Sequence, residues 1–140
     1  MGKAKILEKR YLVGIPIPSL DRKGRPLRPA AADAWTRKAL DELTACFGGA
    51  TPVPAPGVNI VQDRSGKLRV LFEQGQTLVI SACSSRAEFR SKRSRIRRFA
   101  EAMATALRQE AVCVLAFPSD SFLVVLEEPT DRRKGRRRRI

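Results

Sequence analysis

Apolar residues occur along this 140-residue chain in short runs that are rich in Val, Ile, Leu and Phe, with Gly, Pro and charged residues between them. Such runs are typical of β-strands, and Gly and Pro punctuate them as turn formers. The first run ends near Pro18 because proline cannot continue a strand ladder, and Arg64–Lys67 (RSGK) predicts the turn of a hairpin. The predicted strands are residues 6–17, 58–63, 68–73, 76–83, 111–117 and 121–126.

Two segments repeat their apolar residues at the spacing of a helix instead, which predicts helices over residues 30–47 and 91–110. Gly48 and Gly49 end the first helix, since glycine accepts the left-handed conformation there. The proline-rich residues 51–57 (TPVPAPG) predict a stiff connector. The two apolar faces are Trp35, Ala39, Leu40, Leu43 and Phe47, and Ile96, Phe99, Met103 and Leu107.

The predicted order of elements is β-α-β-β-β-α-β-β, which contains the kernel β-α-β-β-α-β. This order predicts the α+β class and a ferredoxin-like sandwich, in which two helices cover one face of a mainly antiparallel sheet. We expect one domain over residues 1–130. Residues 131–140 (DRRKGRRRRI) predict a disordered basic tail, because like charges repel and only Ile140 is apolar.

The formal net charge is +14, and most of it lies in three short blocks. Residues 1–28 carry 8 basic and 2 acidic side chains, residues 86–98 carry 7 and 1, and residues 131–140 carry 7 and 1. The rest of the chain is neutral to acidic. The charge is therefore a property of placed patches, and such patches commonly bind nucleic acid or another polyanion.

The block at residues 86–98 opens the second predicted helix, where the helix dipole already disfavours cations. Free helix N–H groups beside guanidinium groups favour an anion, phosphate above all, although a solvated basic face also fits. We therefore predict nucleic-acid contacts by the basic side chains of this block and of the tail. They are Arg86, Arg90, Lys92, Arg93, Arg95, Arg97, Arg98, Arg132, Arg133, Lys134, Arg136, Arg137, Arg138 and Arg139.

The chain has no histidine, which removes His-based triads, general bases and metal ligands. Glu73 and Glu110 have no spacing that sets them apart from surface carboxylates. Phe72 and Phe117 are expected in the core. The three cysteines, which lack a CxxC spacing, predict buried reduced thiols at Cys46, Cys83 and Cys113. We accordingly predict no catalytic residue, no metal and no cofactor.

These observations favour a non-catalytic module that binds RNA or DNA through phosphate contacts. One alternative is a protein-interaction subunit, which would form a homodimer through a sheet edge or bind an acidic protein partner. A small metal-dependent nuclease is the third hypothesis. No apolar run reaches the length of a membrane span and the N-terminus lacks a signal-peptide pattern, so a cytoplasmic protein is expected.

Three short segments carry a resemblance to a small bacterial family of unknown function. They are a Phe-Gly-Gly-Ala-Thr step at Phe47–Thr51, a strand-turn-strand that ends in Glu at Val58–Glu73, and a Gln-Glu-x-Val step at Gln109–Val112. The resemblance covers about half of the chain and implies a compact α+β unit. It implies no activity and no catalytic residue, and this chain departs from the family at Val58-Asn59 and in its basic blocks.

Overall fold

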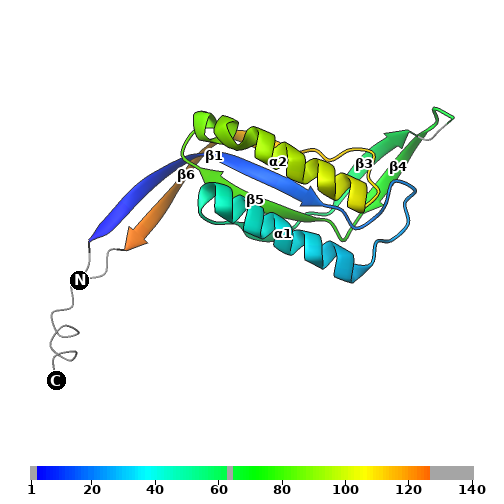
Figure 1. Cartoon of the computed structure of the whole chain (residues 1–140), viewed down its shortest axis with the longest axis horizontal. Coiled ribbons are helices and arrows are strands. Elements are labelled where there is room, and N and C mark those ends of the chain that lie inside the picture. Colours follow the sequence, from blue (N-terminus) through cyan, green and yellow to red (C-terminus); the bar gives the residue numbers. More distant parts are fainter. Residues whose placement is uncertain (1–2, 63–64, 127–140) are drawn as a thin grey trace, which may run out of the picture.

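A computed structural model describes residues 3–62 and 65–126 of the chain. Two helices lie on one face of a four-stranded antiparallel sheet of order β2-β5-β1-β6, and β3 and β4 form a separate two-stranded hairpin (Figure 1). The predicted α+β class is confirmed. The elements are β1 (Ala4–Ile17), α1 (Pro29–Phe47), β2 (Thr51–Pro54), β3 (Gly57–Gln62), β4 (Leu68–Glu73), β5 (Thr77–Cys83), α2 (Arg86–Ala106) and β6 (Leu115–Leu126).

The observed order is β-α-β-β-β-β-α-β, which differs from the predicted order at two places. The predicted connector contains β2, an edge strand, where prolines are tolerated because the outer side needs no ladder hydrogen bonds. The two late strands are one strand, β6. Pro118–Asp120 is an irregularity opposite Lys9–Tyr11 in the β1–β6 ladder, and not a turn.

The second helix begins at Arg86 and ends at Ala106, so the predicted range of 91–110 is shifted at both ends. Ser85 caps its first turn, because the Ser85 hydroxyl accepts a hydrogen bond of 3.2 Å from the backbone N–H of Glu88. A serine cap followed three residues later by glutamate is a recognised start signal for a helix. At the end of α1, Gly48 adopts a left-handed conformation with φ 92°, as predicted.

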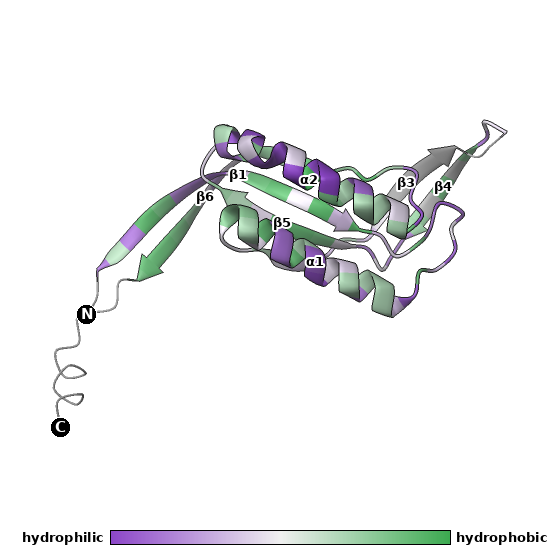
Figure 2. Ribbon diagram, in the orientation of Figure 1, coloured by the Kyte–Doolittle hydropathy of each residue, from purple (hydrophilic) through white to green (hydrophobic). Residues whose placement is uncertain are grey.

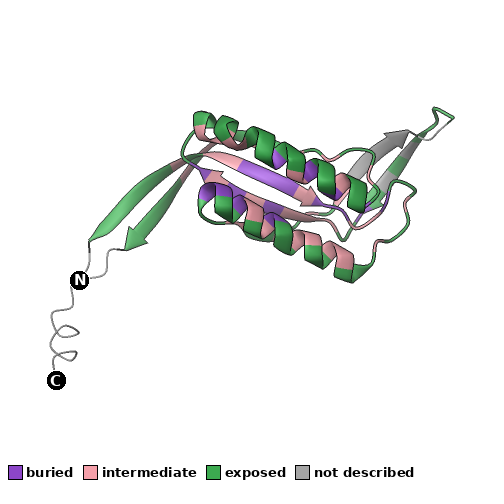
Figure 3. Cartoon of the chain, viewed as in Figure 1, coloured by how far each residue is buried: buried purple, intermediate pink, exposed green. Residues whose placement is uncertain are grey.

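The hydrophobic core lies between the sheet and the two helices (Figure 3). Alternate residues Val13, Ile15 and Ile17 of β1 point to this side, together with Val79 of β5. The predicted helix faces are confirmed at Ala39, Leu43, Phe47, Ile96 and Met103, all buried; Trp35 and Phe99 pack edge to face at their border. Burial of these side chains supplies the main driving force for the fold.

The distal halves of β1 and β6 extend past the helices as a two-stranded ribbon, whose side chains are largely exposed (Figures 1 and 3). We call residues 4–9 and 121–126 the arm. At the opposite end of the molecule, the β3–β4 hairpin stands outside the main sheet (Figure 1). Phe72 of this hairpin and Phe117 of β6 are exposed, so the prediction that both belong to the core is wrong.

Candidate functional site

A cavity of about 440 Å³ opens where the loop after β1, the end of β4, the start of β5 and the segment after α2 meet. Its walls combine apolar side chains and carboxylates that lie far apart in the sequence. The lining residues are Pro16, Pro18, Asp21, Arg22, Ala55, Pro56, Glu73, Gln76, Leu78, Gln109, Glu110, Ala111, Val112, Cys113 and Leu115.

Two carboxylates of the lining, Asp21 and Glu73, are buried. Glu73 is the last residue of β4, and 3% of its surface is exposed. The backbone N–H of Leu20 donates a hydrogen bond of 3.1 Å to Glu73 Oε1. A buried carboxylate is costly unless polar groups satisfy it, and the Leu20 N–H is one such group. The spacing of Glu73 in the sequence does not set it apart from surface carboxylates, but the structure buries it.

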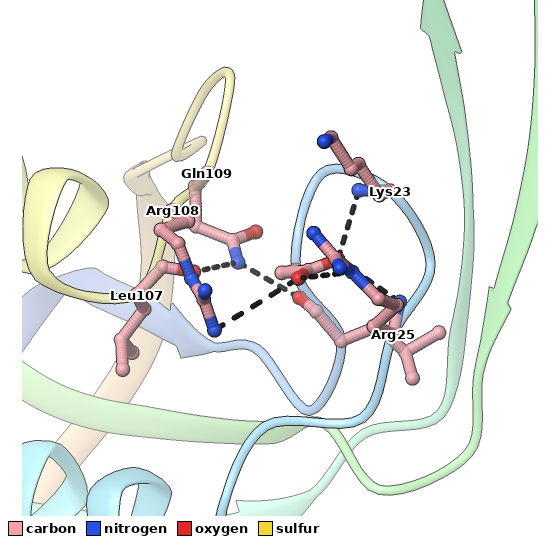
Figure 4. Close-up of polar contacts among 7 residues, drawn as sticks. Lys23, Arg25, Leu107, Arg108 and Gln109 are labelled. Carbon is pink, nitrogen blue, oxygen red and sulfur yellow. Dashed lines mark hydrogen bonds and ion pairs between the residues drawn. The ribbon is translucent and has the colours of Figure 1, made fainter.

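Asp21 organises the loop that forms one side of the cavity (Figure 4). Its Oδ1 accepts hydrogen bonds of 2.9 Å from the backbone N–H groups of Lys23 and Arg25, and its Oδ2 lies 3.3 Å from Arg25 Nε and 4.0 Å from Arg108 Nη2. Burial raises the pKa of this carboxyl, but the two backbone donors and the two guanidinium groups outweigh burial and hold the pKa below its ordinary value.

Gln109 connects the same loop to the end of α2 by hydrogen bonds (Figure 4). Its Nε2 donates to the carbonyl oxygens of Leu20 at 2.8 Å and Leu107 at 2.9 Å, and the backbone N–H of Arg22 donates to Arg108 O at 2.9 Å. On another wall, Gln76 Nε2 donates to Ala55 O at 3.2 Å. These bonds between distant segments fix the walls, so the cavity is largely preformed, as ligand sites usually are.

The cavity carries a charge opposite to that of the protein. Its lining includes three carboxylates, Asp21, Glu73 and Glu110, and one cation, Arg22, whereas the whole chain carries +14. Two arginines outside the lining pair with Asp21, and within the lining itself acidic side chains outnumber basic ones. Such a lining favours a small ligand that is partly cationic and partly apolar, and it disfavours a phosphate.

A second groove, of about 630 Å³, adjoins the cavity and has the opposite character. Arg86, Arg90, Arg93 and Arg97 lie along one side of α2 at helical spacing and line this groove, with Tyr11 and Phe89 stacked 5.7 Å apart beside them. Residues 110–112 line both hollows. We call the first the acidic cavity and the second the arginine groove.

The structure brings four of the predicted nucleic-acid contacts together in the arginine groove, Arg86, Arg90, Arg93 and Arg97, and the other predicted contacts of residues 86–98 lie outside it. Arg95 points to α1, where its guanidinium pairs with Glu42, and Arg97 pairs with Glu101 at 2.9 Å. Lys92 is half-buried and Arg98 is exposed outside the groove lining. The predicted contacts in the tail, residues 132–139, lie outside the described residues, as does part of the predicted hairpin turn at 63 and 64.

The cysteines fall into two kinds. Cys46 and Cys83 are buried as predicted, and burial raises the pKa of both thiols, which makes them poor nucleophiles. Cys113 is exposed and lines the acidic cavity, so the prediction that all three are buried is wrong for this residue. Within residues 3–62 and 65–126, no three His, Cys, Asp or Glu side chains gather as a metal site would require. Neither helix of that part combines the length and apolarity needed to cross a membrane.

Comparison with known proteins relates this fold to an enzyme. No protein-family model matches the chain, and no curated protein matches its sequence. Among solved structures, a phage SAM lyase in complex with S-methyl-5′-thioadenosine is similar, with 16% identity and a TM-score of 0.56 over 85% of this chain and 91% of that one. A phage SAM lyase in the apo state is also similar, with 13% identity and a TM-score of 0.53 over 87% of this chain and 93% of that one.

This finding contradicts the predicted function, a non-catalytic module that binds RNA or DNA. The two similar structures described above are those of a lyase and not of a nucleic-acid-binding protein. The prediction failed because net charge alone does not show where the side chains lie. In the structure four arginines of residues 86–98 line one groove, whereas the adjoining cavity with the buried carboxylate is acidic.

Proposed function

We propose that this chain is an enzyme that binds S-adenosylmethionine in the acidic cavity and cleaves it as a lyase. The observation that carries the proposal is the buried Glu73 carboxylate in an acidic cavity of a strongly basic chain. The similarity to a phage SAM lyase over most of both chains supports the same conclusion. S-Adenosylmethionine bears a positive sulfonium and a positive amino group, which an acidic lining favours.

The cleavage can be written without a base. S-Methyl-5′-thioadenosine, which one similar structure holds, is what remains of S-adenosylmethionine when the bond between the sulfonium sulfur and the γ-carbon of the amino-acid chain breaks. The bonding pair stays on sulfur, which becomes a neutral thioether. The substrate's own carboxylate oxygen bonds to the γ-carbon and closes a five-membered lactone. No proton is gained or lost, which suits a chain without histidine.

Positioning is then the main task of the protein, because an intramolecular displacement depends on holding the reacting atoms in line. We assign to Glu73 the binding of the substrate's amino group by a charge-assisted hydrogen bond. The apolar side chains of Pro18, Val112 and Leu115 line the same cavity and suit the adenine and methylthio groups. An apolar wall also favours the reaction, since the sulfonium charge disperses as the bond breaks.

We also propose a more specific fold for this α+β chain, a ferredoxin-like one. The strand order β2-β5-β1-β6 places β5 between β1 and β2, which helix α1 connects. This split β-α-β arrangement is that of ferredoxin-like proteins, and the β3–β4 hairpin is then an insertion between two of its strands. The inserted hairpin brings Glu73 to the cavity, so we infer that the insertion serves the site.

The proposal is tested by incubating the purified chain with S-adenosylmethionine and measuring S-methyl-5′-thioadenosine by liquid chromatography and mass spectrometry. The spontaneous release is subtracted with a sample without protein. We expect enzyme-dependent product that scales with protein concentration. S-Adenosylhomocysteine, whose sulfur is a neutral thioether, serves as the matched compound and should remain intact. A rate equal to that of the sample without protein would contradict the proposal.

A further inference from the structure

The arginine groove, of about 630 Å³, lies outside the cavity assigned to cleavage and has a long basic side. Arg86 is the first residue of α2, and Arg97 stands eleven positions later. At 1.5 Å per residue, the row of four arginines covers about 16 Å of one side of the helix. Figure 2 shows hydrophilic residues over much of α2.

This row of charge is unfavourable for the helix itself. The four arginines follow one another at spacings of four, three and four residues, at which like charges on a helix repel each other. Arg86 also lies in the first turn, where the helix dipole disfavours a cation. Among the described residues, Arg97 pairs with Glu101, whereas the other three arginines form no ion pair. Local stability therefore does not account for the row, and an anionic ligand beside it would relieve the repulsion.

The floor of the groove is apolar. Ala116 pairs with Val13 across the β1–β6 ladder, and Val13 faces the helices, so Ala116 points to the helix side of the sheet as well. Because β6 is an edge strand of the four-stranded sheet, this side of its start borders α2 instead of lying beneath it. The apolar floor consists of Ile96, Ala100, Val112, Val114 and Ala116.

A ligand that uses the whole groove must be elongated and must combine acidic with apolar groups. A single small anion cannot contact four arginines that are spread over about 16 Å of helix. The same length corresponds to about five residues of an extended peptide, at about 3.3 Å per residue. Carboxylates of such a peptide can form bidentate contacts with guanidinium groups, while its apolar side chains cover the floor.

Two further features of the groove favour a peptide over a nucleic acid. Tyr11 and Phe89 are half-buried and stack on each other 5.7 Å apart, so this aromatic pair does not offer free faces to bases. Glu101 and Glu110 also line the groove and repel a phosphate backbone, which is charged at every nucleotide. A peptide can leave the positions opposite these carboxylates uncharged.

The acidic segment must come from a different protein. Within residues 3–62 and 65–126, acidic side chains stand alone except at Asp41 and Glu42. Glu42 already pairs with Arg95 of the same chain. The described part of this chain therefore contains no acidic run that would match a row of four arginines in a second copy.

We propose that the arginine groove binds an acidic segment of another protein. The proposal goes beyond the proposed cleavage and does not depend on it, because the contacts and the assay involve no S-adenosylmethionine. The charge pairs at the exposed arginines are screened by salt, so the affinity should fall as ionic strength rises.

The test measures binding of a fluorescein-labelled peptide made of three Glu-Asp-Leu-Glu repeats by fluorescence polarisation, at about 50 mM salt so that screening is weak. A peptide of three Gln-Asn-Leu-Gln repeats is the neutral control. R90Q/R93Q removes two charges from the groove, and R37Q/R98Q removes the same charge from two exposed helical positions outside it. Circular dichroism checks that both variants fold.

The acidic peptide should bind the wild type saturably at protein concentrations up to about 100 µM, and the neutral peptide should not. We expect binding about 10-fold weaker to R90Q/R93Q, and within about 2-fold of the wild type to R37Q/R98Q. The absence of saturable binding of the acidic peptide would overturn the proposal. Equal weakening in both variants would also overturn it, because net charge alone would then account for the attraction.

The remaining outcomes decide the class of ligand and the place of binding. Tighter binding of a twelve-nucleotide single-stranded DNA than of the acidic peptide, or equal binding of the neutral peptide, would overturn the proposal. If R90Q/R93Q fails to fold, a form of the acidic peptide that carries benzophenone is photo-crosslinked to the wild type. The cross-links should map to residues 86–104 and 110–116 by mass spectrometry, and cross-links elsewhere would overturn the proposal.

Discussion

The acidic cavity and the arginine groove adjoin along residues 110–112, yet they have opposite charge. The groove repeats the overall charge of the chain, whereas the cavity opposes it. The carboxylates of the cavity come from residues 21, 73 and 110, while four arginines of the groove come from one helix. The comparison teaches that net charge describes the surface of a protein, and that a buried site can have the opposite sign.

The difference also explains which of the two was visible in the sequence. Arg86, Arg90, Arg93 and Arg97 stand at helical spacing in one short segment, so their shared side follows from periodicity. Glu73 and Asp21 are 52 positions apart in the chain, and only tertiary structure brings them to one cavity. Local pattern thus revealed the groove and could not reveal the cavity.

The largest effect that separates the two regions is expected at Glu73. E73Q keeps an oxygen that can accept from the Leu20 N–H but loses the charge that binds the substrate's amino group. A hydrogen bond to a charged group contributes about 1.5–3 kcal/mol. We expect kcat/KM for S-adenosylmethionine cleavage to fall about 10- to 100-fold, measured from initial rates of S-methyl-5′-thioadenosine formation.

The matched control is E101Q, which removes a carboxylate from the lining of the arginine groove. Glu101 is exposed and pairs with Arg97 within the helix, where such pairs contribute little. Cleavage by E101Q should stay within about 2-fold of the wild type, the range of a surface substitution. Equal losses in E73Q and E101Q would contradict the assignment of the cavity as the site.

The next effect concerns the stability of the cavity wall. D21A leaves the backbone N–H groups of Lys23 and Arg25 without their acceptor and removes the anion beside Arg25 and Arg108. We expect the free energy of unfolding at pH 7 to fall by about 1–3 kcal/mol, the cost of lost hydrogen bonds to a charged group, as measured by urea denaturation monitored by circular dichroism.

The pH dependence of this loss follows from the direction of the pKa shift. The pKa of Asp21 lies lower in the folded protein than its ordinary value of 3.8. The carboxylate therefore stabilises the fold above that ordinary value, and the contribution disappears as the pH falls through the lower folded pKa. The unfolding curves of the wild type and D21A should differ at neutral pH and converge in strong acid; a constant difference would argue against the charged contacts.

The fold was more predictable than the site, for a physical reason. The buried faces of both helices follow from a 3.6-residue period, and residues such as Leu43 and Met103 are where that period places them. Strand boundaries depend on partners instead. The irregularity at Pro118–Asp120 resembles a turn in sequence and becomes part of β6 only because β1 runs alongside it. Cys113 was placed wrongly because it precedes β6 and lies in no strand, and Phe117 was placed wrongly because apolar strand residues can face either side of a sheet.

Cys113 offers a chemical probe of the cavity with a smaller expected effect. It is exposed on the cavity lining, whereas burial raises the pKa of the Cys46 and Cys83 thiols and protects them. N-Ethylmaleimide should label Cys113 first, and saturating S-methyl-5′-thioadenosine should slow this labelling severalfold. Peptide mass spectrometry identifies the site, and C113S gives the background. Labelling at a rate that the nucleoside does not change would place its binding elsewhere.

The smallest effect is expected on the groove side of the comparison. Arg93 lines the arginine groove and is absent from the lining of the acidic cavity, and both it and the substrate are cationic. Replacing it by Gln removes one charge from an exposed helical position, so stability should change by no more than about 0.5 kcal/mol. We expect R93Q to cleave S-adenosylmethionine within about 2-fold of the wild-type rate. A loss as large as that of E73Q would indicate that the substrate binds in the arginine groove. The two hollows share residues 110–112, so the charge of their linings would then not identify the site.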